Sequence, residues 1–155
     1  MKSLKITIIG AGSVSFAPPT IRDILLNERI NSVPVEICLM DILEEPLQIS
    51  ADYARAVTTR LNRSAVVTST THLEHALAGA SFVITAIEKD RYFYWSQDFH
   101  IPRKYGSNQI YGENGGPGGM FHTLRNLPPM LEIARAMERV CPEAWLINYT
   151  NPEAK

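Results

Sequence analysis

The first residues in this chain with a type and spacing suited to chemistry are two glycines that directly follow an apolar segment. Leu4–Ile9 is rich in β-branched residues, and Gly10 and Gly12 come immediately after it. Glycines at the end of a strand permit a tight turn and a close approach of the backbone to a pyrophosphate. Ser15 stands where the pattern G-x-G-x-x-G has its third glycine, so the pattern alone is a weak indication. The residues that we expect to hold a dinucleotide are Gly10, Gly12, Ser13 and Val14.

An acidic residue follows the next apolar segment. Val35–Met40 is succeeded by Asp41, at the place where nucleotide-binding βαβ units carry the acid that accepts hydrogen bonds from ribose hydroxyls. A carboxylate there would repel a 2′-phosphate, so Asp41 favours NAD over NADP as the cofactor. The alternative interpretation is that Asp41 only caps a helix that begins near Leu43.

A third segment of interest is unusually rich in glycine. Lys104–Gly119 contains six of the nine glycines of the chain, together with the polar residues Glu113 and Asn114. Such a segment is either a flexible surface connection or a backbone shaped to approach a ligand closely. Its predicted place at the ligand-binding edge of a sheet favours the second interpretation.

The elements that must position these residues alternate between strands and helices. This alternation predicts an α/β fold, a Rossmann-like doubly wound parallel sheet, whose ligands bind beyond the carboxyl ends of the strands. The turn at Gly10, Asp41, the loop 87–90 and Asn151 all lie at the carboxyl ends of predicted strands. The expected strands are 4–9, 35–41, 64–68, 82–87 and 144–152. One expected helix begins near Pro18 and Pro19, and the others are 44–62, 72–78 and 127–140.

Composition and length exclude several classes of protein. The formal net charge of −1 over 155 residues gives no reason to expect nucleic acid or an anionic membrane as a partner. The apolar runs are too short to span a bilayer and no signal-peptide pattern is present, so we expect a cytoplasmic protein. Cys38 and Cys141 are interpreted as buried hydrophobic residues. His72 and His75 are interpreted as a solvated helix face and not as a metal site.

Five segments, in order along the chain, match a known family: Ile8–Ser13, Leu39–Asp41, Ile101–Gly106, Gly112–Gly119 and Pro142–Pro152. With these segments the sequence resembles the NAD- and manganese-dependent glycosidases of glycoside hydrolase family 4. The first two segments also fit many dehydrogenases, whereas the glycine-rich segment and the final segment are much more specific. The chain is most similar to the branch of the family that contains α-galactosidases.

The resemblance implies a hydrolysis that passes through oxidation, in contrast to the usual pair of catalytic carboxylates in glycosidases. The sugar C3 hydroxyl gives hydride to NAD, and the resulting ketone makes the C2 proton acidic. Loss of that proton gives an enolate that a divalent metal can stabilise. Elimination then expels the aglycone from C1, water adds, and the hydride returns.

The resemblance also implies roles for particular residues. Asn151 would bind the hydroxyls of the substrate, although an Asx turn before Pro152 is the alternative. Glu113 would help to make the catalytic tyrosine of the family more basic. The metal ligands and the catalytic tyrosine of the family lie beyond the matched part. We therefore expect no Mn2+ ligand within this chain, and we expect the metal ligands and the tyrosine to follow Lys155. Residues 1–155 would then be the NAD-binding domain of a longer, homo-oligomeric enzyme and would be inactive alone.

Substrate class is indicated by one aromatic residue. Trp95 stands where the phospho-sugar members of the family tend to have an arginine, so we expect an unphosphorylated hexoside of the α-galactoside type. Two other functions stay open: an NAD-dependent 2-hydroxyacid dehydrogenase and a non-catalytic NAD-binding module. A requirement for a divalent metal would distinguish the glycosidase from both.

Overall fold

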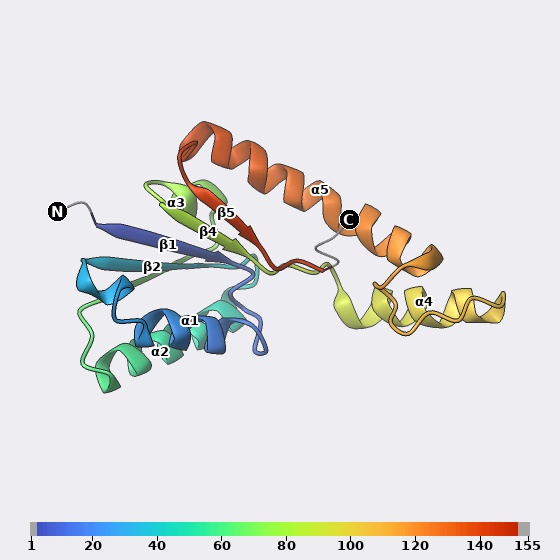
Figure 1. Ribbon diagram of the computed structural model, residues 1–155, viewed down its shortest axis with the longest axis horizontal. Coiled ribbons are helices and arrows are strands. Elements are labelled where there is room, and N and C mark those ends of the chain that lie inside the picture. The colour runs from blue at the N-terminus through green and yellow to red at the C-terminus, as the bar shows by residue number, and fades with distance from the viewer. Residues whose placement is uncertain (1–2, 152–155) are drawn as a thin grey trace. The chain divides into compact units, whose positions relative to one another are not determined.

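The computed structural model describes residues 3–151, which contain a five-stranded parallel sheet (Figure 1). The strand order is β3-β2-β1-β4-β5, so the chain reverses its direction of winding between β3 and β4. This order is that of a doubly wound sheet and confirms the predicted fold class. The strands are β1 (Leu4–Ile9), β2 (Val35–Met40), β3 (Val66–Thr70), β4 (Phe82–Thr85) and β5 (Trp145–Asn148).

Helices connect the strands. Figure 1 shows α1 and α2 on one face of the sheet and α3 on the opposite face, as right-handed crossovers in the two directions require. The α-helices are α1 (Ala17–Leu26), α2 (Glu44–Arg60), α3 (Leu73–Leu77), α4 (Arg91–Lys104) and α5 (Gly116–Val140), with one 3-10 turn η1 (Ile30–Ser32).

The chain divides into two compact units. The first contains the residues up to Ala86 together with Arg135–Asn148, and therefore the whole sheet. The second contains Ile87–Ala134 and the residues from Tyr149 onward, and therefore α4 and most of α5. The assignment of residues 1–155 to one NAD-binding domain stays a prediction.

Burial on both faces explains the apolar character of the central strands. In β1, Ile6, Ile8 and Ile9 are buried, and so is the polar residue Thr7. Thr7 Oγ1 donates a hydrogen bond of 2.8 Å to the main-chain oxygen of Ala76, so its hydroxyl is satisfied inside the core. The predicted burial of the two cysteines is confirmed, since Cys38 and Cys141 are free and buried, and burial raises the pKa of both thiols.

Several predicted boundaries were wrong. The strand expected at 64–68 lies at Val66–Thr70, and the strand expected at 82–87 ends at Thr85, where its pairing with β1 and β5 ends. The last strand ends at Asn148, well before 152, which lies outside the described residues. No helix in the described part of the chain is long and apolar enough to cross a membrane.

The largest error concerns the glycine-rich segment. Helix α4 was not predicted, because its buried residues Asp98 and Pro102 do not form an apolar stripe while Tyr92 and Phe93 are exposed. Helix α5 begins at Gly116, eleven residues before the expected start, so the connecting loop is only 105–115. Gly118 lies so close to α4 that an added Cβ would collide with the main-chain oxygen of Asp98. At this position glycine serves the packing of one helix against another.

Candidate functional site

The turn after β1 is tied to the end of β2. Gly10 has a φ of 88°, a left-handed conformation that favours glycine. The N–H groups of Gly10 and Ala11 both donate to the main-chain oxygen of Met40, each at 3.0 Å. These bonds place the turn beside Asp41, the residue that follows Met40.

Gly12 and Asp41 are in direct contact. The Gly12 N–H donates to Asp41 Oδ2 at 2.8 Å, across 29 positions of sequence. A Cβ at Gly12 would lie 2.8 Å from that oxygen and 3.0 Å from Pro46 Cβ, so only glycine admits the carboxylate at this distance. The predicted phosphate-binding turn and the predicted ribose acceptor therefore form one local structure.

The alternative interpretation, that Asp41 only caps the following helix, was wrong because Asp41 is not the N-cap residue. Helix α2 begins at Glu44, and its N-cap residue, Leu43, makes no side-chain cap bond. Asp41 Oδ1 accepts the Leu43 N–H at 3.0 Å, which is an Asx turn before the helix. Each carboxylate oxygen has more than one lone pair, so both keep acceptor capacity for ribose hydroxyls.

The turn also offers donors for an anion. Within residues 3–151, the N–H groups of Val14 and Ser15 have no protein acceptor, and the Val14 side chain is 79% exposed. Pro18 and Pro19 lack an N–H, so the first turn of α1 has few donors of its own. A pyrophosphate bound here would therefore take its donors from the turn itself. Ser13 adds a hydroxyl, whose oxygen accepts the Phe16 N–H at 3.2 Å.

In the second unit, one face of α5 binds the segments that follow β4 and β5 in the chain. His122 Nε2 lies 3.0 Å from the main-chain oxygen of Asn151. One turn further along α5, Asn126 Oδ1 accepts the Lys89 N–H at 3.1 Å, and Asn126 Nδ2 donates to the main-chain oxygen of His122. Both His122 and Asn126 are buried.

Thr150 extends this contact by one more helical turn. The Ile87 N–H donates to Thr150 Oγ1 at 3.1 Å, and the same hydroxyl lies 3.5 Å from Met130 Sδ. Since His122, Asn126 and Met130 are four residues apart, they lie on one face of the helix. This face fixes the main chain of residues 150–151.

Charged side chains surround His122. Its Nδ1 lies 3.7 Å from Asp98 Oδ2 and 3.9 Å from Glu88 Oε1. Arg125 donates to Asp98, and its guanidinium lies 4.5 Å from the centre of the Tyr94 ring. Desolvation raises the pKa of Glu88, although the nearby Arg91, His122 and Arg125 oppose the change.

Glu113 lies beside an aromatic cluster. The Trp95 indole N–H donates to the Glu113 carboxylate. The Trp95 ring stacks on Phe99 with an interplanar angle of 4° and a centroid distance of 5.6 Å, and the Arg103 guanidinium covers the Phe99 ring at 4.8 Å. Glu113 thus has a fixed partner in α4.

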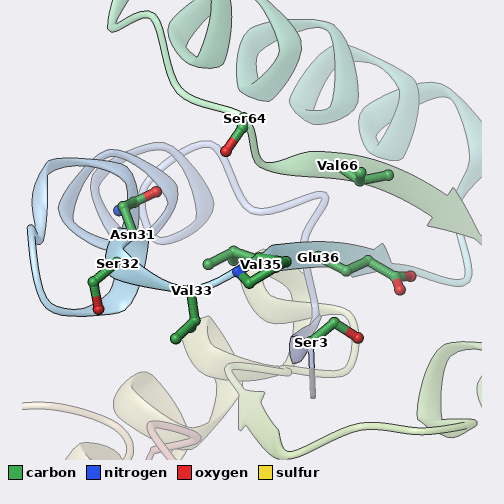
Figure 2. A pocket seen from close by; sticks show the side chains of 9 residues that line it. Ser3, Asn31, Ser32, Val33, Val35, Glu36, Ser64 and Val66 are labelled. Atoms are coloured by element: carbon green, nitrogen blue, oxygen red, sulfur yellow. The ribbon is translucent and has the colours of Figure 1, made fainter. Parts of the chain in front are cut away.

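Two other features do not belong to this site. No group of three or more His, Cys, Asp or Glu residues within the described range 3–151 could hold a metal ion. A hollow of about 600 Å3, lined by residues such as Ser3, Asn31 and Glu36, lies at the amino ends of the strands (Figure 2). Ligands of doubly wound sheets bind at the opposite, carboxyl ends.

The structure thus brings Gly12 together with Asp41, and it gives Asn151 and Glu113 partners that the sequence did not reveal. His122 was missed altogether as a site residue. The available signal was a pair of polar residues, His122 and Asn126, four apart in a stretch for which the sequence predicted no element, between the glycine-rich segment and the helix expected at 127–140.

Comparisons with known proteins agree with one another. The family model described as Family 4 glycosyl hydrolase matches residues 5–155. An alpha-glucosidase from Erwinia rhapontici is 41% identical over 152 residues, which are 97% of this chain and 33% of the relative. An alpha-galactosidase from Bacillus subtilis (strain 168) is 41% identical over 151 residues, which are 97% of this chain and 34% of the relative.

This chain is also similar to a solved structure. The 6-phospho-alpha-glucosidase from gut microorganisms, in complex with NAD and Mn2+, has a TM-score of 0.85 and 25% identity over 99% of this chain and 34% of that chain. The chain spans about a third of the length of each of these relatives.

Proposed function

Because the chain belongs to the family 4 glycosyl hydrolases, we propose that it is the NAD-binding part of a glycosidase that cleaves unphosphorylated hexosides of the α-galactoside type. The proposed reaction is oxidation of the sugar at C3, elimination of the aglycone from C1, addition of water and reduction. The activity, substrate and partners of the whole protein are proposals, since the chain spans about a third of its relatives.

The contact between Gly12 and Asp41 is the single observation that best supports NAD as the cofactor. The Val14 N–H and the Ser13 hydroxyl would donate to the pyrophosphate, and Gly10 and Gly12 would form the tight turn that lets the main chain approach it closely. Asp41 would accept hydrogen bonds from the adenosine ribose while it keeps its bonds to Gly12 and Leu43. When bound, NAD would take the hydride from C3 and return it at the end of the cycle.

On the substrate side, Asn151 and Glu113 have separate proposed roles. The Asn151 side chain is a donor and an acceptor, so it can bind two adjacent sugar hydroxyls. Glu113 would keep a negative charge near the tyrosine base of the family, which makes that tyrosine a stronger base. Its hydrogen bond from Trp95 would hold the carboxylate in place.

Trp95 is the basis for the choice of an unphosphorylated sugar. Its indole is uncharged and is held by Glu113 and Phe99, so it offers no cation for a phosphate. The names of the alpha-glucosidase and the alpha-galactosidase cited above agree with this choice.

A divalent metal is also proposed for the complete protein, as Mn2+ is present in the 6-phospho-alpha-glucosidase structure. The residues described at 3–151 offer no ligand set for it, so no step is assigned to a metal through residues of this chain. The cytoplasmic location and the homo-oligomer expected from the sequence also remain proposals.

The test is hydrolysis of an aryl α-galactoside by the full-length protein after removal of bound NAD and metal. We expect activity only when NAD and Mn2+ are both restored, with deuterium from D2O at C2 of the released sugar, because the mechanism breaks the C2–H bond. Activity in the stripped, chelator-treated protein, or a product without deuterium at C2, would refute the proposal. Net accumulation of NADH with a 2-hydroxyacid would instead favour the dehydrogenase alternative.

A further inference from the structure

His122 is almost completely buried, with 1% of its surface exposed, and its imidazole contacts one main-chain group of the predicted substrate site. The main-chain oxygen of Asn151, at 3.0 Å from Nε2, can only accept a hydrogen bond. The proton of this bond must therefore reside on His122 Nε2. The bond joins the middle of α5 to the residue predicted to bind the sugar.

The other ring nitrogen makes no hydrogen bond to a described residue that would explain a histidine at this position. Nδ1 has no hydrogen-bond partner within the part of the chain that the structure describes. The oxygens of Asp98 and Glu88, at 3.7 and 3.9 Å, are beyond hydrogen-bond distance. A buried polar atom without a partner costs free energy that an apolar side chain would avoid. The hydrogen bond to Asn151 is therefore the distinctive contribution of this side chain.

The main chain that His122 holds is fixed at two successive residues. Thr150 is buried and accepts the Ile87 N–H, while the carbonyl of Asn151 accepts the bond from His122. Asn151 itself is exposed, so its side chain is available to a ligand. A fixed peptide restricts the directions in which that side chain can extend, and a binding group that is held in place loses less entropy when the ligand binds.

We propose that His122 is a positioning residue that fixes the peptide carbonyl of Asn151 and so holds the Asn151 side chain in the orientation that binds the glycoside. This inference rests on the proposed role of Asn151 in sugar binding. It assigns to His122 an effect on the affinity for the sugar and none on the affinity for NAD, whose proposed site is the turn at Gly12.

Two substitutions separate the hydrogen bond from the mere presence of a side chain. In His122→Gln the amide nitrogen can take the place of Nε2 and donate to the Asn151 carbonyl. In His122→Asn the shorter side chain places its amide near the position of Nδ1 and cannot reach that carbonyl. His75→Asn is the matched control, because His75 is an exposed histidine on α3.

The variants are compared in the full-length protein by steady-state hydrolysis of an aryl α-galactoside, by calorimetric titration with NAD and by thermal unfolding. We expect His122→Asn to lower kcat/KM roughly tenfold, mainly through a higher KM for the glycoside, as loss of one positioning hydrogen bond implies. His122→Gln should recover most of this loss, and His75→Asn should match wild type. The NAD dissociation constant should not change in any variant.

Equal activity of the Gln and Asn variants would overturn the proposal. So would a loss of activity that follows a parallel loss of thermal stability or of NAD binding, because that result would indicate a general structural role.

A second measurement separates failure of this inference from failure of the proposed function. In full-length protein labelled with 15N-histidine, the His122 Nε2 proton should give a slowly exchanging resonance that disappears in His122→Asn. If the resonance is present but the wild type shows no NAD-dependent hydrolysis, the proposed function fails and the contact stands. If hydrolysis occurs but no protected imidazole proton is found, the positioning role is refuted.

Discussion

Replacement of Gly12 by alanine tests whether the turn after β1 and Asp41 form one local structure. The φ of Gly12 is not in the left-handed region, so alanine brings no backbone strain there. The added Cβ would lie 2.8 Å from Asp41 Oδ2 and 3.0 Å from Pro46 Cβ. The carboxylate must therefore move, and the hydrogen bond from the Gly12 N–H is lost.

The size of the effect follows from that bond. A hydrogen bond to a charged group contributes about 1.5–3 kcal/mol, and the half-buried Asp41 regains part of this from water, so we expect a loss of about 2 kcal/mol in unfolding free energy. For a chain of this length that corresponds to a fall in Tm of roughly 4–8 °C. Affinity for NAD should fall at least about tenfold, because the ribose acceptor is displaced.

The assay is a double-mutant cycle. Urea unfolding and calorimetric titration with NAD are measured for wild type, Gly12→Ala, Asp41→Ala and the double variant. Because both single substitutions remove the same hydrogen bond, the double variant should lose clearly less free energy than the two single losses added together. The non-additive part should be about 1 kcal/mol or more.

Additive losses would refute the reasoning, since they would mean that Gly12 and Asp41 act independently. A Gly12→Ala variant with unchanged stability and unchanged NAD affinity would show that the turn admits a Cβ, contrary to the contact distances.

Four further results are expected. Calorimetric titration should show that NAD binds more tightly than NADP, because the 2′-phosphate of NADP would meet the Asp41 carboxylate, and that Asp41→Ala weakens the binding of NAD. Tighter binding of NADP than of NAD would contradict this. In the full-length protein, Asn151→Ala should lower kcat/KM for an aryl α-galactoside at least about tenfold and leave the NAD dissociation constant unchanged. A parallel loss of hydrolysis and of NAD affinity would argue against a sugar-binding role. The 155-residue chain should release no aryl group with NAD and Mn2+ above a Gly12→Ala control, because residues 3–151 offer no metal-ligand group. Desolvation raises the pKa of the Glu88 carboxyl from 4.5, so ionisation of Glu88 destabilises the folded chain as the pH rises above that value. In urea unfolding, the stability of Glu88→Gln relative to wild type should therefore increase between about pH 4 and pH 7. A stability difference that is the same at both pH values would contradict this prediction.

The sequence by itself determined the parts of this protein that depend on neighbours in the chain. A β-branched segment followed by glycines, and a second apolar segment followed by Asp41, predicted two strands and the turn that joins a strand to a helix. The alternation of such segments predicted the doubly wound sheet, because each pattern reflects burial of a single element. The residues of the proposed cofactor site could therefore be named before the fold was known.

Only the tertiary structure decided how the remaining residues meet. Helix α4 could not be predicted, since its burial depends on Asp98 and Pro102 packing against other segments and not on a periodic apolar stripe. The close approach of Gly118 in α5 to the main chain of Asp98 in α4 is likewise a contact between distant segments. The bond from His122 to Asn151 joins residues 29 positions apart, as does the bond from Gly12 to Asp41. Contacts of this kind form when distant segments pack together, and no local pattern of residue types specifies their geometry.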